Sequence, residues 1–198
     1  MTSGSEIAFS SAENLADLYR KKALSPVEAA EILFARIEVL QPKLNAFCIV
    51  DRDGALAAAR ASEQRWRQGA PLSPLDGVPV TIKDLVLMRG FPTLRGSKLI
   101  DPAQDWSEDA PAVARLREAG AVILGKTTTP EFGWKAIGDS PLTGITRNPW
   151  NLQHTPGGSS AGAAAACAAG IAPLHVGSDY QAIAAHRQRR TRLSQQVI

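Results

Sequence analysis

The sequence predicts an α/β layered fold, because segments with helical periodicity alternate with short β-branched segments along most of its 198 residues. The composition, with 44% hydrophobic and 21% charged residues, is that of a folded globular domain. The length is sufficient for one ordinary domain with a short appendage. No internal repeat is evident.

Three helices are predicted in the first 70 residues. The first covers about 12–23, where apolar residues recur at helical spacing. The second begins at Ser25, which can form a capping box with Glu28 and is followed by a proline in the first turn. The third covers about 54–67 and ends at Gly69. The apolar residues that give the second helix its buried stripe are Ala29, Ile32, Leu33, Ile37 and Leu40.

Two strands are predicted on either side of a fourth helix. The segment 77–82 is short and β-branched, which is typical of a strand. Ser107 is placed to cap a helix that runs to Arg117, and 121–124 form the next strand. The stretch 127–156 is polar and rich in glycine and proline, and its length indicates loops that line a site.

The segment Thr155–Gly162 contains the pair Ser159 and Ser160 and leads directly into the alanine-rich run 163–169. Glycine permits sharp turns, and alanine is the best helix former. The serines should therefore lie where a tight loop enters a helix, beside unpaired backbone N–H groups and the positive end of the helix dipole. Such a place can hold a carboxylate, a phosphate or an oxyanion. The alternative, a flexible connector, is disfavoured by the apolar helix that follows.

Lys83 follows the predicted strand 77–82 directly. A lysine at the end of a buried strand can be shielded from water, and burial lowers the pKa of a lysine towards the range of a general base. The alternative is a surface lysine paired with Asp84, its neighbour in the sequence.

The segment Gly120–Thr127 matches the phosphate-loop pattern G-x-x-x-x-G-K-[ST]. We reject the match, because a phosphate loop follows a strand, whereas here the four variable positions are themselves apolar and strand-like. Pro130 and Gly133 also stand where the helix of a phosphate loop should extend.

The formal net charge of +3 comes from the end of the chain. Residues 180–198 hold four arginines and no lysine, aspartate or glutamate, and without these four arginines 18 basic residues face 19 acidic ones. We therefore expect no nucleic-acid partner for the body of the chain. No segment approaches the ~18 apolar residues of a membrane span, and residues 1–10 show no secretory signal.

Cysteine and histidine show no metal-site pattern. Cys48 and Cys167 lie far apart and lack ligand-type neighbours, so we expect free thiols in a cytoplasmic protein. The three histidines, at 154, 175 and 186, lack the spacing of metal ligands. We expect neither a metal nor a cofactor.

A collinear series of motifs resembles the amidase signature family, and the resemblance covers nearly all of residues 10–179. It implies a mixed β-sheet covered by helices, of which this chain would form the N-terminal, incomplete part. One small departure is Ala161, where the family usually has glycine. The motifs are the segments 77–85, 90–96, 125–132 and 144–162, and Gly177-Ser178-Asp179.

The resemblance also implies a reaction, the hydrolysis of the carbon–nitrogen bond of a small-molecule amide to a carboxylic acid and ammonia. In the family a lysine base activates a serine nucleophile through a second serine, which follows a cis peptide bond. Lys83 matches the base and Ser159 matches the relay serine, which places the cis bond at Gly158–Ser159. An unprotonated lysine can withdraw a proton from one hydroxyl through another, without histidine.

The nucleophile of the family has no match. After Asp179 the family has a variable residue, two glycines and the nucleophilic serine, but here Gln181 and Ala182 replace the glycines and Ile183 replaces the serine. We therefore expect residues 1–179 to form a partial amidase signature domain and the chain to be inactive. Residues 180–198 are expected to be a disordered Arg/Gln-rich tail outside the family, typical of a displaced reading frame or a gene fragment.

Two alternatives stay open. The chain could be related to the glutamine-hydrolysing subunit of a tRNA amidotransferase, although the segments 91–97 and 133–134 are more similar to stand-alone amidases. From a different class, it could be a non-catalytic module that binds nucleic acid through the basic tail. Salt-dependent retention on DNA that disappears when 180–198 are deleted would identify that case.

Overall fold

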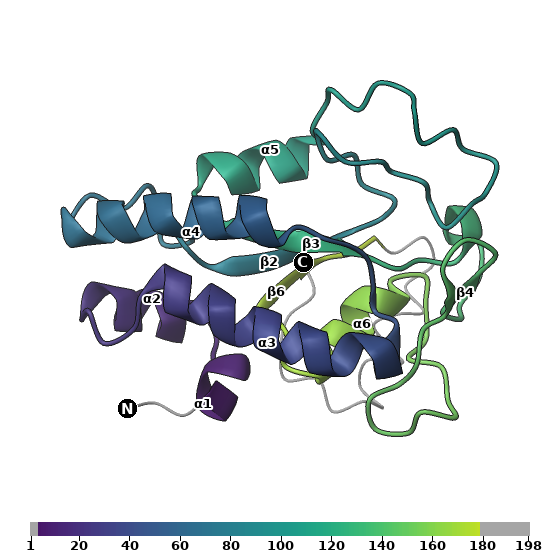
Figure 1. The fold of residues 1–198 in the computed structure, drawn as a ribbon, viewed down its shortest axis with the longest axis horizontal. Coiled ribbons are helices and arrows are strands. Elements are labelled where there is room, and N and C mark those ends of the chain that lie inside the picture. The colour runs from purple at the N-terminus through teal and green to yellow at the C-terminus, as the bar shows by residue number, and fades with distance from the viewer. Residues whose placement is uncertain (1–3, 179–198) are drawn as a thin grey trace.

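The computed structural model describes residues 4–178, which form an α/β domain around a four-stranded mixed sheet (Figure 1). The strands lie in the order β1–β3–β2–β6; β2 pairs in parallel with β3 and β6, and β1 pairs antiparallel to β3. This arrangement confirms the predicted fold class. The tail 180–198, including Ile183, lies outside the described residues. The strands are β1 (Phe47–Val50), β2 (Pro79–Lys83), β3 (Val122–Thr127) and β6 (Leu174–Val176).

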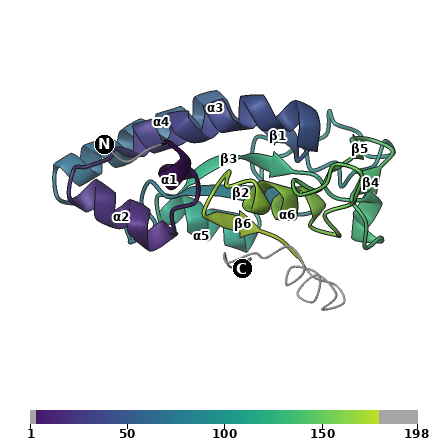
Figure 2. The ribbon, with the colours of Figure 1, turned by 90° about the horizontal axis from the view of Figure 1, so that it is seen from below.

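Helices cover both faces of this sheet. The long helices α3 and α4 lie on one side and α5 lies on the other (Figure 2). The helix α6 belongs to the same apolar cluster as α3 and α4, whereas α1 and α2 pack on α3 and α4 through a separate cluster. The helices are α1 (Gly4–Ala8), α2 (Ala12–Arg20), α3 (Pro26–Leu44), α4 (Arg52–Arg67), α5 (Pro111–Glu118) and α6 (Ala161–Ala168).

A capping box sets where α3 begins, and a proline sets where α5 begins. The Ser25 hydroxyl accepts a hydrogen bond from the Glu28 amide, and the Glu28 carboxylate accepts one from the Ser25 amide, so the predicted capping box is confirmed. The predicted cap at Ser107 is wrong, since its hydroxyl donates to Asp105. The helix begins later because Pro111 disfavours a helical conformation in the residue before it, and that residue, Ala110, is extended.

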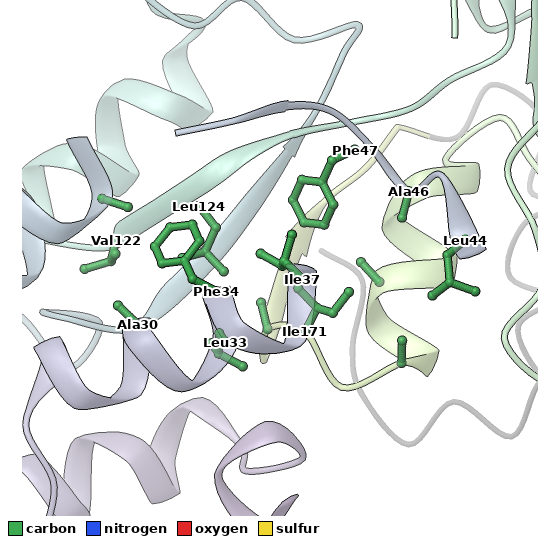
Figure 3. Close-up of a cluster of buried hydrophobic side chains, with 14 of the residues drawn as sticks. Ala30, Leu33, Phe34, Ile37, Leu44, Ala46, Phe47, Val122, Leu124 and Ile171 are labelled. Carbon is green, nitrogen blue, oxygen red and sulfur yellow. The ribbon is translucent and has the colours of Figure 1, made fainter. Parts of the chain in front are cut away.

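The main core fills the space between α3, α4 and one face of the sheet (Figure 3). Phe34 and Ile37 of α3 and Leu124 of β3 belong to this cluster and are buried. The helix α6 joins it through alanines, and its burial confirms what the alanine-rich sequence indicated. A Cβ at Gly162 would lie 2.2 Å from the carbonyl oxygen of Ala46, so only glycine permits α6 to lie this close to the segment before β1.

A bulge at Gly125 shifts the register between β2 and β3. After the bulge, Ile82 is paired with Lys126 and Lys83 with Thr127. Because side chains alternate along a strand, Lys83 and Lys126 leave the sheet on opposite faces. The segment Gly120–Thr127, which matches the phosphate-loop pattern, contains the strand β3. A strand stands where the loop should be, so our rejection of that match is confirmed.

The segment 127–156 is largely loop, as predicted. It includes a 3₁₀ turn, Glu131–Gly133, and a hairpin of β4 (Asp139–Ser140) and β5 (Gly144–Ile145). Within residues 4–178, no helix combines the length and the apolar character that a membrane crossing requires.

Candidate active site

Lys83 is the last residue of β2, and its side chain is fully buried, with 0% exposed. The alternative of a surface lysine is therefore wrong. Asp84, its neighbour in the sequence, points to the opposite face of the sheet, where its carboxylate lies 2.7 Å from the Lys126 ammonium. The Nζ of Lys83 is thus held apart from that pair by the sheet itself.

Ser159 and Ser160 lie directly before α6, where the sequence placed them. The peptide bond between Gly158 and Ser159 is cis, at the position that the family resemblance implied. A Cβ at Gly158 would lie 2.9 Å from main-chain atoms of Ile137, so the loop also excludes a side chain there.

The fold brings Lys83 and Ser159 together although 76 residues separate them in the sequence. The Lys83 Nζ lies 2.7 Å from the Ser159 Oγ, within hydrogen-bond distance. The carboxyl end of β2 and the loop that enters α6 meet at one edge of the parallel strands, which is where sites form in α/β sheets. The predicted proximity is confirmed, and the catalytic roles of both residues stay predictions.

Ser178 belongs to the same cluster. It follows β6, and its hydroxyl and carbonyl oxygens lie 2.9 and 3.2 Å from the Lys83 Nζ. Ser160 holds Ser178 in place, because its hydroxyl donates to the Ser178 carbonyl at 3.1 Å and accepts from the Ser178 amide at 3.2 Å. Sequence reasoning did not assign Ser178 a role; the available signal was its place in the Gly177-Ser178-Asp179 motif.

A buried polar pair aligns β6 with β2. The Thr81 Oγ1 lies 2.7 Å from His175 Nδ1, and His175 Nε2 lies 3.0 Å from the Ala172 carbonyl oxygen. A carbonyl only accepts, so Nε2 carries the proton and Nδ1 accepts from Thr81. Burial lowers the pKa of His175 to about 4, so this imidazole is neutral near pH 7. It aligns the strand that leads to Ser178.

The opposite face of the sheet carries a second buried lysine. Lys126 Nζ donates to the Pro92 carbonyl at 2.8 Å and to the Thr93 hydroxyl at 2.6 Å, in addition to its ion pair with Asp84. Burial raises the pKa of Asp84 and lowers that of Lys126, and the ion pair opposes both effects. The cluster joins the ends of β2 and β3 to the loop at 92–93.

Cysteine chemistry is not favoured at this site. Burial raises the pKa of Cys48 to about 12 and that of Cys167 to about 11, so both are protonated thiols near neutral pH. Among residues 4–178 no three His, Cys, Asp or Glu side chains lie close enough together to hold a metal ion.

Known proteins are similar to this chain in sequence and in structure. A family model described as Amidase matches residues 28–181. A glutamyl-tRNA(Gln) amidotransferase subunit from Geobacter metallireducens is 46% identical over 165 residues, which are 83% of this chain and 34% of that protein. The corresponding protein from Geobacter sulfurreducens is 47% identical over 168 residues, again 83% and 34%.

Solved structures share the fold. A bacterial aryl acylamidase of the amidase signature family aligns with a TM-score of 0.78 and 36% identity, over 83% of this chain and 34% of that one. A peptide amidase in complex with the competitive inhibitor chymostatin aligns with a TM-score of 0.81 and 31% identity, over 87% and 37%. This chain thus spans about a third of the length of the relatives that it matches.

Proposed function

Because this chain belongs to the amidase family, we propose that it holds the base and the relay serine of an amide-hydrolysing centre. The observation that carries the proposal is the 2.7 Å contact between the buried Lys83 Nζ and the Ser159 Oγ. In the proposed reaction an amide and water give a carboxylic acid and ammonia. Lys83 takes a proton from Ser159, and Ser159 takes one from the nucleophilic hydroxyl.

The nucleophile is the part of this centre that the sequence does not supply at the family's position, where Ile183 stands. We propose that residues 1–179 form the family domain, that 180–198 lie outside it, and that the 198-residue chain does not turn over amides. We also propose a cytoplasmic location, which the two free thiols favour.

A hybrid protein tests the base and the relay. Residues 1–178 are joined to the part of the aryl acylamidase that follows the matching segment, and hydrolysis of an aryl acylamide is measured. We expect turnover, and we expect Lys83→Ala and Ser159→Ala each to lower kcat/KM by about 10²–10⁴-fold. Lys98→Ala, at an exposed lysine, is the control and should leave kcat/KM essentially unchanged. A folded hybrid whose activity survives Lys83→Ala would contradict the proposal.

A second candidate concerns the substrate. The two Geobacter amidotransferase subunits, at 46–47% identity, are more similar to this chain than the two solved amidases, at 31–36%. This favours glutamine as the amide, in place of a simple aliphatic or aromatic amide. A second hybrid, completed with the remainder of the Geobacter metallireducens protein, should then release ammonia from glutamine; release from aryl amides alone would exclude this candidate.

A further inference from the structure

We propose that Ser159 of this chain is itself an acyl acceptor, which Lys83 activates towards esters with good leaving groups. This activity goes beyond the proposed amide-hydrolysing centre, in which Ser159 only passes a proton between two other groups. It rests on the same pair of residues but needs neither the missing nucleophile nor an amide substrate.

The accessibility of the two side chains differs in the way such a reaction requires. Lys83 is fully buried, whereas Ser159 is half-buried and lies on the loop that enters α6. Ser159 thus stays partly exposed to a reagent, whereas the Lys83 side chain is shielded from water. A serine hydrogen-bonded to a shielded base is the usual arrangement of an activated nucleophile, and serine–lysine pairs are one known form of it.

Ser178 orients the amine of Lys83 towards this task. An unprotonated lysine has two N–H donors and one lone pair. The Ser178 carbonyl can only accept, so one N–H points to it at 3.2 Å, and the Ser178 hydroxyl at 2.9 Å can take the other. In this arrangement the lone pair can accept the proton of the Ser159 hydroxyl, whose Oγ lies 2.7 Å from the Lys83 Nζ.

The same contacts select Ser159 over Ser178 as the acceptor. The amide and the carbonyl of Ser178 are both held by Ser160, and the Ser178 carbonyl also accepts from Lys83. Ser178 is therefore contacted by an N–H group of the lysine and not by its lone pair. Ser159 lies in a confined place: a Cβ added at Gly133 would already be in van der Waals contact with the Ser159 Oγ, at 3.8 Å, and would collide with the Leu85 Cδ1 at 2.7 Å. A small acyl group such as acetyl is therefore the donor that suits this hydroxyl.

The chemical step balances without a further reactant. With p-nitrophenyl acetate, the Ser159 Oγ forms a bond to the acetyl carbon, the ester C–O bond breaks, and p-nitrophenolate leaves with the electron pair. The serine proton passes to Lys83. A phenolate leaves without being protonated, unlike an amide nitrogen, so the step does not require the missing nucleophile or the general acid of amide hydrolysis. The product is acetyl-Ser159, formed once per chain.

Intact-mass spectrometry and peptide mapping of the full 198-residue chain test the proposal. With p-nitrophenyl acetate we expect one rapidly formed acetyl group on Ser159. Ser159→Ala should abolish that fast adduct, and Lys83→Met should slow its formation about 100-fold or more, as expected for loss of a general base. Ser107→Ala, at an exposed serine, is the matched control and should leave the rate unchanged. A fast adduct on Ser178 or on a lysine instead, or an unchanged rate in Lys83→Met, would overturn the proposal.

A second pair of variants keeps the test decisive if Lys83→Met fails to fold. Ser178→Ala removes the hydroxyl that orients the amine and should slow acetylation about tenfold, while Ser178→Thr keeps the hydroxyl and should restore the rate. Equal rates in both variants would contradict the orienting role and with it the proposal. The chain can be acetylated at Ser159 even if the hybrid does not hydrolyse amides, and the hybrid can hydrolyse amides even if Ser159 is not acetylated. The two proposals can therefore fail separately.

Discussion

At the scale of single residues, two buried lysines on neighbouring strands have different partners because the pleat of the sheet separates them. Lys83 faces the hydroxyls of Ser159 and Ser178. Lys126 faces the carboxylate of Asp84. A lysine paired with a carboxylate is held as an ammonium, whereas one that contacts hydroxyls can exchange a proton with them. The two faces of one sheet thus carry a structural lysine and a candidate base.

The buried pair of Lys126 and Asp84 should be costly to break. Lys126→Met leaves a carboxylate that is almost completely buried without its counter-charge, and we expect it to lower the free energy of unfolding by about 3–5 kcal/mol. Urea denaturation measures the loss. The double variant Asp84→Asn, Lys126→Met should recover part of it, because no uncompensated charge remains. A double variant as unstable as Lys126→Met alone would contradict this explanation.

The neutral His175 should make the stability depend on pH. Its pKa, about 4 in the folded chain against 6.5 as the ordinary value, means that below pH 6.5 the unfolded chain binds a proton that the folded chain does not. Stability should therefore fall as the pH drops from 6.5 to about 4, by a contribution of about 3 kcal/mol from this residue.

Urea titrations at about pH 7.5 and about pH 5 measure that dependence. In His175→Gln the difference between the two pH values should shrink, because the titrating group is gone. The control His154→Gln, at an exposed histidine, should keep the difference of the parent chain. Equal pH dependence in His175→Gln and the parent would exclude His175 as its source.

At the scale of elements, the position of the candidate site depends on how β3 pairs with its two neighbours. The bulge at Gly125 sets which β3 residues face α6 and which face α5. The β1 chain passes closely over the bulge, since a Cβ at Gly125 would lie 2.2 Å from the Ile49 carbonyl oxygen. The edge strand and the central strands therefore meet at a point that accepts only glycine.

Two glycine substitutions separate this crowding from simple backbone strain. Gly90 and Gly125 both have positive φ, 85° and 145°, but an added Cβ at Gly90 meets nothing within 4 Å. Gly90→Ala should cost about 1–2 kcal/mol of unfolding free energy, and Gly125→Ala clearly more, because β1 must move away from β3. The Asp51 amide, bonded to the Leu124 carbonyl at 3.0 Å, should exchange faster with solvent in Gly125→Ala alone. Equal losses in the two variants would contradict the close approach.

At the scale of the whole molecule, the chain combines the paired Lys83 and Ser159, the candidate base and relay, with a sequence that departs from the family pattern at the position of the nucleophile. Ile183 has no nucleophilic atom, and Gln181 and Ala182 replace the glycines whose N–H groups would help to bind the oxyanion. Removing one oxyanion donor typically lowers a rate by about 10²–10³-fold, and loss of the nucleophile lowers it further.

We therefore expect no ammonia release above background when the chain is incubated with simple aliphatic or aromatic amides. Ile183→Ser alone should not restore turnover, because the two glycines are still absent. Lys83→Ala is the control for any residual signal. Turnover that disappears in Lys83→Ala would show that the chain hydrolyses amides with a different nucleophile.

The sequence by itself determined the features that depend on neighbouring residues. The capping box at Ser25, the alanine-rich helix after Ser160 and the strand that ends at Lys83 follow from local periodicity, caps and turn residues. The short strands β1 and β6 escaped prediction, because strands of three or four residues gain their stability from partners across the sheet. The five-residue helix α1 escaped it as well, because a helix this short is marginal without packing. The expected cap at Ser107 was wrong, because Pro111, four residues later, keeps the residue before it extended and so delays the start of α5.

Only the tertiary structure decided which side chains meet. The role of Lys83 as a candidate base could be proposed from its place at the end of a strand, but its burial and its contact with Ser159 depend on α6 and β6 packing around it. The contacts of Ser178 with Lys83 and of Lys126 with Asp84 could not be foreseen for the same reason. Burial and hydrogen-bond distance are relations between residues far apart in the chain, and the pattern along a sequence contains no distances.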